Sequence, residues 1–181
     1  MRQFFKYIVA LNSILFALSR LGGKTDMHKL CKILYFADQK HLSIYGRSIT
    51  GDTYIAMQYG PVPSNVDDIL KAVRGDSFFS DHIDDLKDKF SFVNRYVVEA
   101  AAAPDMDELS ESEVECLDFA IEYCRDKSFD ELTRLSHGLA WSSTARDRAI
   151  SVKDILRELG DEEEYVEYIA GQLRLEEALK C

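Results

Sequence analysis

Apolar side chains recur at helical spacing along most of this chain, most regularly between residues 26 and 45. Four of them fall at positions i, i+3, i+4 and i+7 and so share one face of a helix: Met27, Leu30, Cys31 and Leu34. Other apolar residues widen this face: Ile33, Phe36, Ala37 and Ile44. We therefore predict a central helix that is covered on more than one side, capped by Thr25 or Asp26 and stopped by Gly46.

The rest of the pattern predicts further helices. We expect one over residues 4–19, one over 64–74 and a last one from residue 161. Three more begin where a serine is followed three residues later by an acid, as is typical of helix starts: Ser110 with Glu113, Ser128 with Glu131, and Ser151 with Asp154. The second of these helices is expected to bury one face, formed by Phe129, Leu132 and Leu135.

Two regions alternate between apolar and polar residues, as strands do. Residues 53–58 predict a strand that leads into a sharp extended corner, Tyr59-Gly60-Pro61-Val62-Pro63. Residues 90–100 predict a hairpin that turns at Asn94-Arg95, with one long strand as the alternative, and residues 76–88 predict a loop or a marginal helical turn. The fold class that follows is α+β and predominantly α-helical, with a small antiparallel sheet or hairpin. We expect a single domain over residues 1–181, with an internal linker at 104–109.

The formal net charge of −10 limits the partners. A surface this acidic repels phosphate backbones, which argues against nucleic acid. The lysines of the central helix, Lys29, Lys32 and Lys40, are expected to be solvated surface residues. No apolar run approaches the roughly 20 residues that span a bilayer. The apolar N-terminus, interrupted by Asn12 and Ser13, predicts an amphipathic helix rather than a signal sequence, so we expect a cytoplasmic protein without a membrane partner.

The four cysteines, Cys31, Cys116, Cys124 and Cys181, form no CxxC pair. Three of them lie in or beside apolar faces, which favours reduced, buried thiols over a disulfide framework. His28 and Cys31 have a spacing that one metal ion could bridge on a helix, but such a site needs two further ligands. We therefore expect no metal and no cofactor, and we interpret His28 as a surface histidine.

Asp38 and His41 lie one turn apart on the buried stripe of the central helix. A carboxylate and an imidazole placed in this way could be a catalytic base and its orienting group. They could equally satisfy the buried backbone of the Tyr59-Gly60-Pro61 corner, which we predict packs against this side of the helix. We favour the structural role, because no local motif places a serine, cysteine or threonine nucleophile.

The only tryptophan, Trp141, follows His137 by four residues in a segment rich in hydroxyl groups. A lone tryptophan is usually a core anchor whose indole N–H finds one acceptor. It can also lie at an interface, where tryptophan, tyrosine and arginine dominate the binding energy. We favour the core anchor, because the flanking helices need an apolar residue to pack on.

Two stretches combine these motifs in a recognisable order. The first, residues 29–65, contains Lys32–Asp38, His41-Leu42, Tyr45-Gly46-Arg47 and Tyr59-Gly60-Pro61-Val62. The second, residues 135–159, contains Leu135-Ser136-His137, then Trp141, and a helix at 151–159. Together they resemble the Panacea domain, the SocA-like antitoxin family, in which the histidine and tryptophan form an H-x-x-x-W pattern. The resemblance implies a module that binds a toxin encoded beside it, and neutralises it directly or by delivery to a protease.

Two other classes of function stay open. A small enzyme could use Asp38, His41 and His137, if these side chains converge in an open pocket. A regulatory protein of a phage or mobile element could act on DNA, if it has a contiguous basic face. The chain has no phosphate-binding glycine loop, nucleophile elbow or zinc-protease motif, so we expect a non-enzyme. Its partner-binding or structural residues are expected to be Asp38, His41, Tyr59, Gly60, Pro61, His137 and Trp141, with Tyr59 and Trp141 as candidate anchors.

Overall fold

The computed structural model describes residues 5–76 and 86–179 of the 181-residue chain. Over these ranges the fold is α+β and mostly helical, as predicted. In chain order the elements are α1 (Tyr7–Arg20), β1 (Lys24–Asp26), α2 (Met27–Tyr45), β2 (Tyr54–Met57), β3 (Gly60–Pro63), α3 (Ser64–Arg74), β4 (Phe90–Phe92), β5 (Val97–Ala100), a 3₁₀ turn (Met106–Glu108), α5 (Glu111–Cys124), α6 (Phe129–Ser136), α7 (Leu139–Ser142), α8 (Val152–Glu158) and α9 (Glu163–Leu179).

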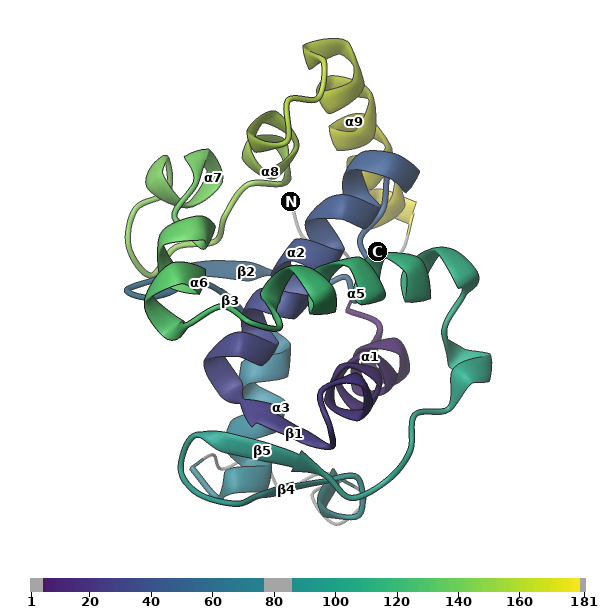
Figure 1. Cartoon of the computed structure of the whole chain (residues 1–181). Helices are drawn as coiled ribbons and strands as arrows, with labels where there is room; N and C mark the ends of the chain where they lie inside the picture. Colours follow the sequence, from purple (N-terminus) through teal and green to yellow (C-terminus); the bar gives the residue numbers. More distant parts are fainter. Residues whose placement is uncertain (1–4, 77–85, 180–181) are drawn as a thin grey trace.

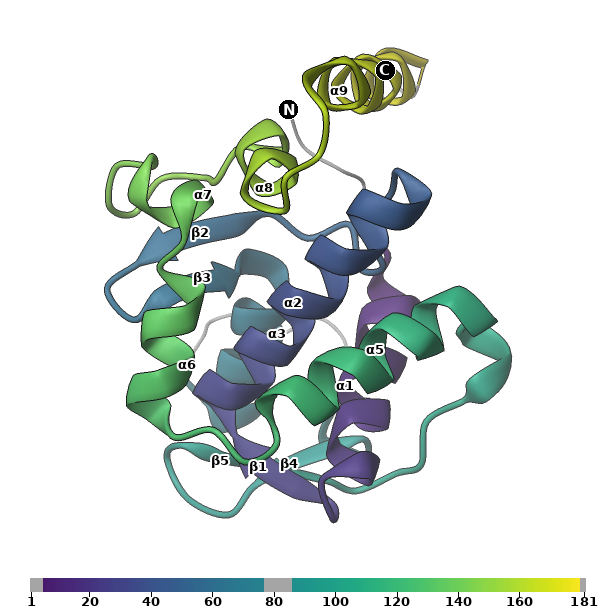
Figure 2. The ribbon, with the colours of Figure 1, turned by 45° about the horizontal axis from the view of Figure 1, so that its top comes forward.

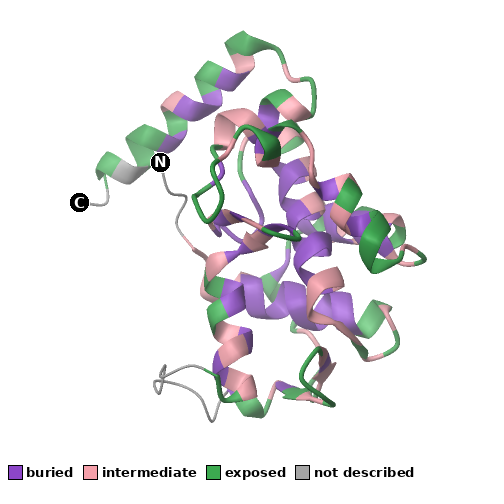
Figure 3. Cartoon of the chain, turned by 90° about the vertical axis from the view of Figure 1, so that its left-hand side faces the viewer, coloured by how far each residue is buried: buried purple, intermediate pink, exposed green. Residues whose placement is uncertain are grey.

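Helix α2 is the centre of the fold. It runs from the sheet that contains β1 toward α8 and α9 at the opposite end of the molecule, with α1 and α5 along its side (Figure 1, Figure 2). Leu30 and Ile33 belong to a hydrophobic cluster with residues of α1 and α5, whereas Tyr35 and Leu42 belong to a second cluster with residues of β2, α8 and α9. The helix is therefore covered on more than one side, as predicted, and Figure 3 shows it buried along most of its length.

Local capping groups set the ends of the helices, largely as predicted. The Asp26 carboxylate caps α2 by accepting a hydrogen bond from a backbone N–H of the first turn (2.8 Å), and Gly46 ends the helix in the left-handed conformation (φ 71°). Capping boxes are present at Ser110 and at Ser128. Ser151 caps α8 by accepting from the N–H two residues further on.

One antiparallel sheet has the strand order β1-β5-β4. The strands β4 and β5 form the hairpin that the sequence predicts over residues 90–100. Strand β1 was not predicted. Its three residues, which pair with Val97–Glu99, are too few to show an alternating pattern, and their partner strand is remote in the sequence. A strand of this kind is stabilised by its partner rather than by its own sequence.

The predicted extended corner is itself a strand, which corrects the prediction. Strands β2 and β3 form an antiparallel hairpin in which Ala56 faces Pro61 and Tyr54 faces Pro63. A proline has no N–H to donate and is therefore confined to the edge of a sheet, which is where β3 lies. The other side of β2 is covered by residues 147–150, which hydrogen bond to it.

Other expectations concern less regular parts of the chain. The loop expected at residues 76–88 lies largely outside the residues that the structure describes. The segment 104–109 contains the 3₁₀ turn. Cys31, Cys116 and Cys124 are buried free thiols, as predicted. Among the helices described, none combines the length and the apolar character that a membrane crossing requires.

Candidate functional site

The Asp38 carboxylate is buried on α2 and organises the segment that leads into β2. It accepts hydrogen bonds from the backbone N–H groups of Ile49 (2.7 Å) and Thr50 (3.1 Å), and from the hydroxyls of Thr50 (2.6 Å) and Tyr54 (2.7 Å). Burial raises the pKa of Asp38, and these hydrogen bonds oppose the rise because they stabilise the charged form. A carboxylate that accepts four hydrogen bonds has a structural role, which here is to hold the segment before β2 against α2.

The His41 imidazole links the end of α2 to the start of α5. Its Nδ1–H donates to the Arg47 carbonyl (2.6 Å), which leaves Nε2 to accept from the Ser112 hydroxyl (3.1 Å). Burial lowers the pKa of His41 and so favours this neutral form. Both ring nitrogens are thus used in holding the turn after α2.

The Tyr59-Gly60-Pro61 corner does not pack against Asp38 and His41, which corrects the prediction. It packs instead on the first half of α2, where Lys32 Nζ donates to the Pro61 carbonyl (2.8 Å) and His28 Nε2 lies 3.2 Å from the Tyr59 carbonyl. Periodicity identified the buried face of α2 correctly, but not which turn of that face the hairpin covers. Asp38 and His41 hydrogen bond instead to residues 47–50, which lie between the end of α2 and β2.

Gly60 is required where it stands, because its backbone has φ 101° and its surroundings are full. A Cβ atom at this position would lie 2.4 Å from Ser136 Oγ and 2.8 Å from Lys32 Nζ. Such distances are well inside van der Waals contact, so a side chain at position 60 would require Ser136, Lys32 or the hairpin itself to shift.

His137 and Trp141 stack on each other, with ring centroids 3.6 Å apart and planes 6° from parallel. The indole N–H donates to the Met57 carbonyl at the end of β2 (2.8 Å), so Trp141 fastens α7 to the hairpin. The ring is partly buried and its one donor has an acceptor, as the role of a core anchor requires.

The three residues considered for catalysis have separate surroundings. Asp38 binds the segment before β2, His41 joins α2 to α5, and His137 lies against Trp141. Within the part of the chain that the structure describes, no hydrogen bond or ring contact joins any two of the three. Both carboxylate oxygens of Asp38 and both ring nitrogens of His41 are in addition hydrogen bonded within the fold.

The most prominent open feature near the corner is a groove of about 600 Å³, which we call the Tyr59 groove. It lies between the start of α2, the β2–β3 turn, α3 and the start of α6. The Phe129 ring forms its wall, between the rings of His28 (centroids 4.0 Å apart) and Tyr59 (5.3 Å). Tyr59 is 52% exposed and Phe129 46% exposed, so both rings are available to a partner.

Charged side chains surround this groove, and most of them are neutralised. Lys71 pairs with Asp67, and Arg146 lies 3.8 Å from Asp147. Lys32 also lines the groove, but its side chain is buried and has no carboxylate partner among the described residues. The prediction that Lys32 is a solvated surface residue is therefore wrong.

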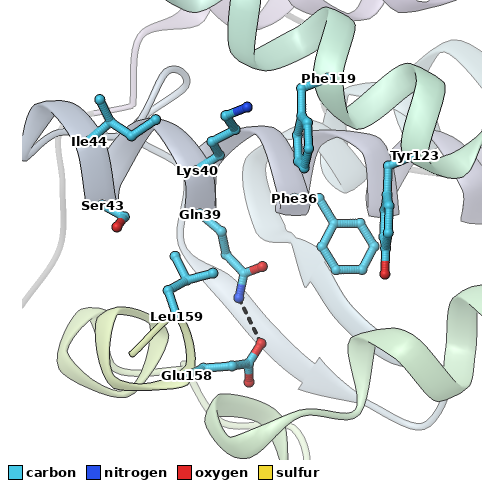
Figure 4. Close-up of a pocket in the computed structure, with 9 residues that line it drawn as sticks. All are labelled: Phe36, Gln39, Lys40, Ser43, Ile44, Phe119, Tyr123, Glu158 and Leu159. Atoms are coloured by element: carbon cyan, nitrogen blue, oxygen red, sulfur yellow. Dashed lines mark hydrogen bonds between the residues drawn. The ribbon is translucent and has the colours of Figure 1, made fainter. Parts of the chain in front are cut away.

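A second hollow, of about 440 Å³, lies between α2, α5 and the end of α8, and we call it the Phe119 pocket (Figure 4). Lys40 Nζ lies over the Phe119 ring, 3.6 Å from its centroid. On the opposite side, Gln39 Nε2 donates to Glu158 Oε1 (2.8 Å). This pocket is apolar enough to hold a hydrophobic side chain, and none of the seven candidate site residues predicted from the sequence lines it.

Two residues of the groove escaped the sequence analysis. Phe129 was assigned to a buried face, and His28 to the surface. The structure buries Leu132 of that face and leaves Phe129 half-exposed beside a half-buried His28. No local signal separates Phe129 from Leu132, because both lie on the same apolar face and the tertiary fold decides which part of that face is covered.

Comparison with known proteins was made by family and by individual relatives. The family model described as the antitoxin SocA-like, Panacea domain matches residues 30–142, which is more than half of the chain. The matched residues include the hairpin, Phe129 and the stacked pair His137 and Trp141. Searches among curated proteins and among solved structures return no significant match.

Proposed function

The chain belongs to the antitoxin SocA-like Panacea family, and we propose that it neutralises a toxin encoded beside it by holding a segment of that toxin in the Tyr59 groove. The observation that carries the proposal is the wall of exposed aromatic rings, Tyr59 and Phe129, which lies inside the matched residues. Aromatic side chains at the centre of an interface supply most of its binding energy.

The aromatic wall is formed before any partner arrives. Phe129 is held on one side by the His28 ring, and Tyr59 meets it edge-on at 67°. Rings that are already fixed lose little conformational entropy on binding, so more of the energy gained by burying them becomes affinity. This supports a groove in which the rings of Tyr59 and Phe129 are already in contact before a partner binds.

The overall charge supports a basic toxin. At a net charge of −10, complementary charge accelerates the encounter, and the acceleration weakens as ionic strength rises. The association rate should therefore depend on salt more strongly than the dissociation rate does.

We propose further that neutralisation needs no catalysis by this chain. Two of the three groups considered for acid–base chemistry are used in the fold, since Asp38 holds the segment before β2 and His41 holds the turn after α2. The third, His137, stacks on Trp141 and contacts neither of them. Direct masking of the toxin and delivery to a protease both begin with the same physical complex, so the groove serves either route.

The test is co-expression with the open reading frame beside this gene, followed by co-purification. Wild-type protein should restore growth and co-purify with the toxin. Tyr59→Ser should weaken the complex by about 2 kcal/mol, the loss expected of an aromatic anchor. Phe119→Ser is the matched control, because it removes a ring of similar exposure (46% against 52% for Tyr59) from the other pocket and should leave the complex intact.

The outcomes separate the alternatives. Rescue of growth without physical association contradicts neutralisation by binding. Loss of the complex in Phe119→Ser but not in Tyr59→Ser would show that the toxin binds at the Phe119 pocket instead of the Tyr59 groove. Rescue that disappears only in a protease-deficient host identifies delivery rather than masking. If the adjacent gene is not toxic and nothing co-purifies, the proposal fails.

A further inference from the structure

The Tyr59 groove has a buried positive charge at its floor. Lys32 is 0% exposed, and its ammonium makes one hydrogen bond, to the Pro61 carbonyl (2.8 Å). An ammonium has three N–H donors, so two of them have no acceptor among the described residues. Buried lysines are rare unless they are paired with a carboxylate, because removing the charge from water is costly.

The titratable groups that act on Lys32 do not neutralise it. His28 and Cys31 lie on its own helix, Cys124 lies on α5, and His137 follows α6. Burial raises the pKa of each of the two thiols to about 12, so neither is a thiolate at neutral pH. Burial and the Lys32 charge together lower the pKa of His28 to about 4, so this ring is neutral as well.

The two imidazoles leave further polar atoms unsatisfied beside Lys32. His28 Nδ1 and His137 Nε2 are buried and have no hydrogen-bond partner in the described structure. Because His28 Nε2–H donates to the Tyr59 carbonyl, Nδ1 presents a lone pair. A buried polar cluster that is only partly satisfied calls for a ligand or water to complete it.

We propose that the toxin segment in the Tyr59 groove carries a glutamate or aspartate whose carboxylate pairs with Lys32. This inference rests on the proposed function and names the chemistry of the partner. A carboxylate is favoured because the other cations named at the groove, Lys71 and Arg146, already have acidic partners, so Lys32 is the charge left to balance. An apolar residue beside the acid packs on Tyr59 and Phe129.

The geometry sets how the pair forms. Lys32 Nζ can keep its bond to Pro61 and use a second N–H for the carboxylate. The turn at Tyr59 and Gly60 lies directly over the amine, since a Cβ on Gly60 would be 2.8 Å from Nζ. The carboxylate therefore reaches Lys32 only if this turn shifts outward, and the bond then forms in a site from which water is excluded, where a charge-assisted hydrogen bond is strong.

The experiment titrates the full chain with capped dipeptides and follows the Lys32 side chain by NMR. The probes are acetyl-glutamyl-phenylalanine amide, its glutamine analogue, and acetyl-glutaminyl-phenylalanine with a free C-terminus. The glutamate probe should bind about tenfold more tightly than its glutamine analogue, which corresponds to about 1.4 kcal/mol. It should also raise the pKa of Lys32 from about 8, because the carboxylate favours the charged ammonium.

Lys32→Met should abolish the preference for glutamate, while Lys40→Met, on the same helix but over Phe119, should retain it. If Lys32→Met does not fold, the wild-type chain provides the test: the inference holds only if the glutamate probe raises the pKa of Lys32. Equal binding of the glutamate and glutamine probes, no binding, or preference for the free C-terminus overturns the inference. Each of these results leaves rescue and co-purification with the toxin untouched, so the two proposals fail separately.

Discussion

Replacing Gly60 with alanine should destabilise this protein far more than one methyl group normally would. The backbone at Gly60 has φ 101°, where an L-residue is strained by roughly 1–2 kcal/mol. The added Cβ would also lie 2.4 Å from Ser136 Oγ and 2.8 Å from Lys32 Nζ, and overpacking of this kind costs about 1–3 kcal/mol. Urea denaturation of Gly60→Ala should therefore give a free energy of unfolding about 2–5 kcal/mol below that of the wild-type chain.

Gly75 supplies the matched control. It ends α3 with φ 88°, but nothing lies within 4 Å of a Cβ built there. Gly75→Ala should therefore lose only the backbone term, roughly 1–2 kcal/mol. Adding Ser136→Ala to Gly60→Ala should recover part of the difference, because it removes the nearest atom. If Gly60→Ala lowers the free energy of unfolding by no more than Gly75→Ala does, then close packing of the hairpin on α2 and α6 is not the reason that position 60 requires glycine.

Three further predictions concern the buried polar groups. Trp141→Phe keeps an aromatic ring but leaves the Met57 carbonyl without its donor, and should lower the free energy of unfolding by about 1–2 kcal/mol in urea. Asp38→Asn replaces a carboxylate that accepts four hydrogen bonds, two of them from Thr50 and Tyr54 side chains, and should lower it by about 2–3 kcal/mol. The pKa of His28 is about 4 in the folded chain against 6.5 when unfolded, so below pH 6.5 the unfolded chain binds the extra proton and stability falls as the pH drops toward 4. Denaturation of His28→Gln over this pH range should show a shallower loss, and an unchanged slope would contradict the assignment.

Local signals in the sequence predicted the helices well. The cap at Asp26 and the left-handed Gly46 act within one turn of the residues they terminate, so a single sequence contains what is needed to place them. The same holds for the capping boxes at Ser110 and Ser128. The central position of α2 also followed from its wide apolar face.

What the sequence could not supply was the pairing of remote segments. Lys32 was read as solvated because charge usually means exposure, but the hairpin, with Pro61 as acceptor, covers it. Strand β3 was predicted as a sharp extended corner, because Pro61 disfavours the helical region for the residue before it. It is a strand because β2 pairs with it. The groove was missed for the same reason, since His28, Tyr59 and Phe129 come from three elements that only the tertiary fold brings together.

The prolines of β3 also restrict how a partner can join this molecule. An open sheet edge can take up a strand of almost any sequence, because main-chain hydrogen bonds ignore side chains. Pro61 and Pro63 have no N–H to offer along one edge of the hairpin, and residues 147–150 occupy the other. A partner that binds beside this hairpin must therefore contact side chains rather than add a strand to the sheet. Residues around Tyr59 can therefore be exchanged to alter recognition at this face without altering the paired backbone beneath it.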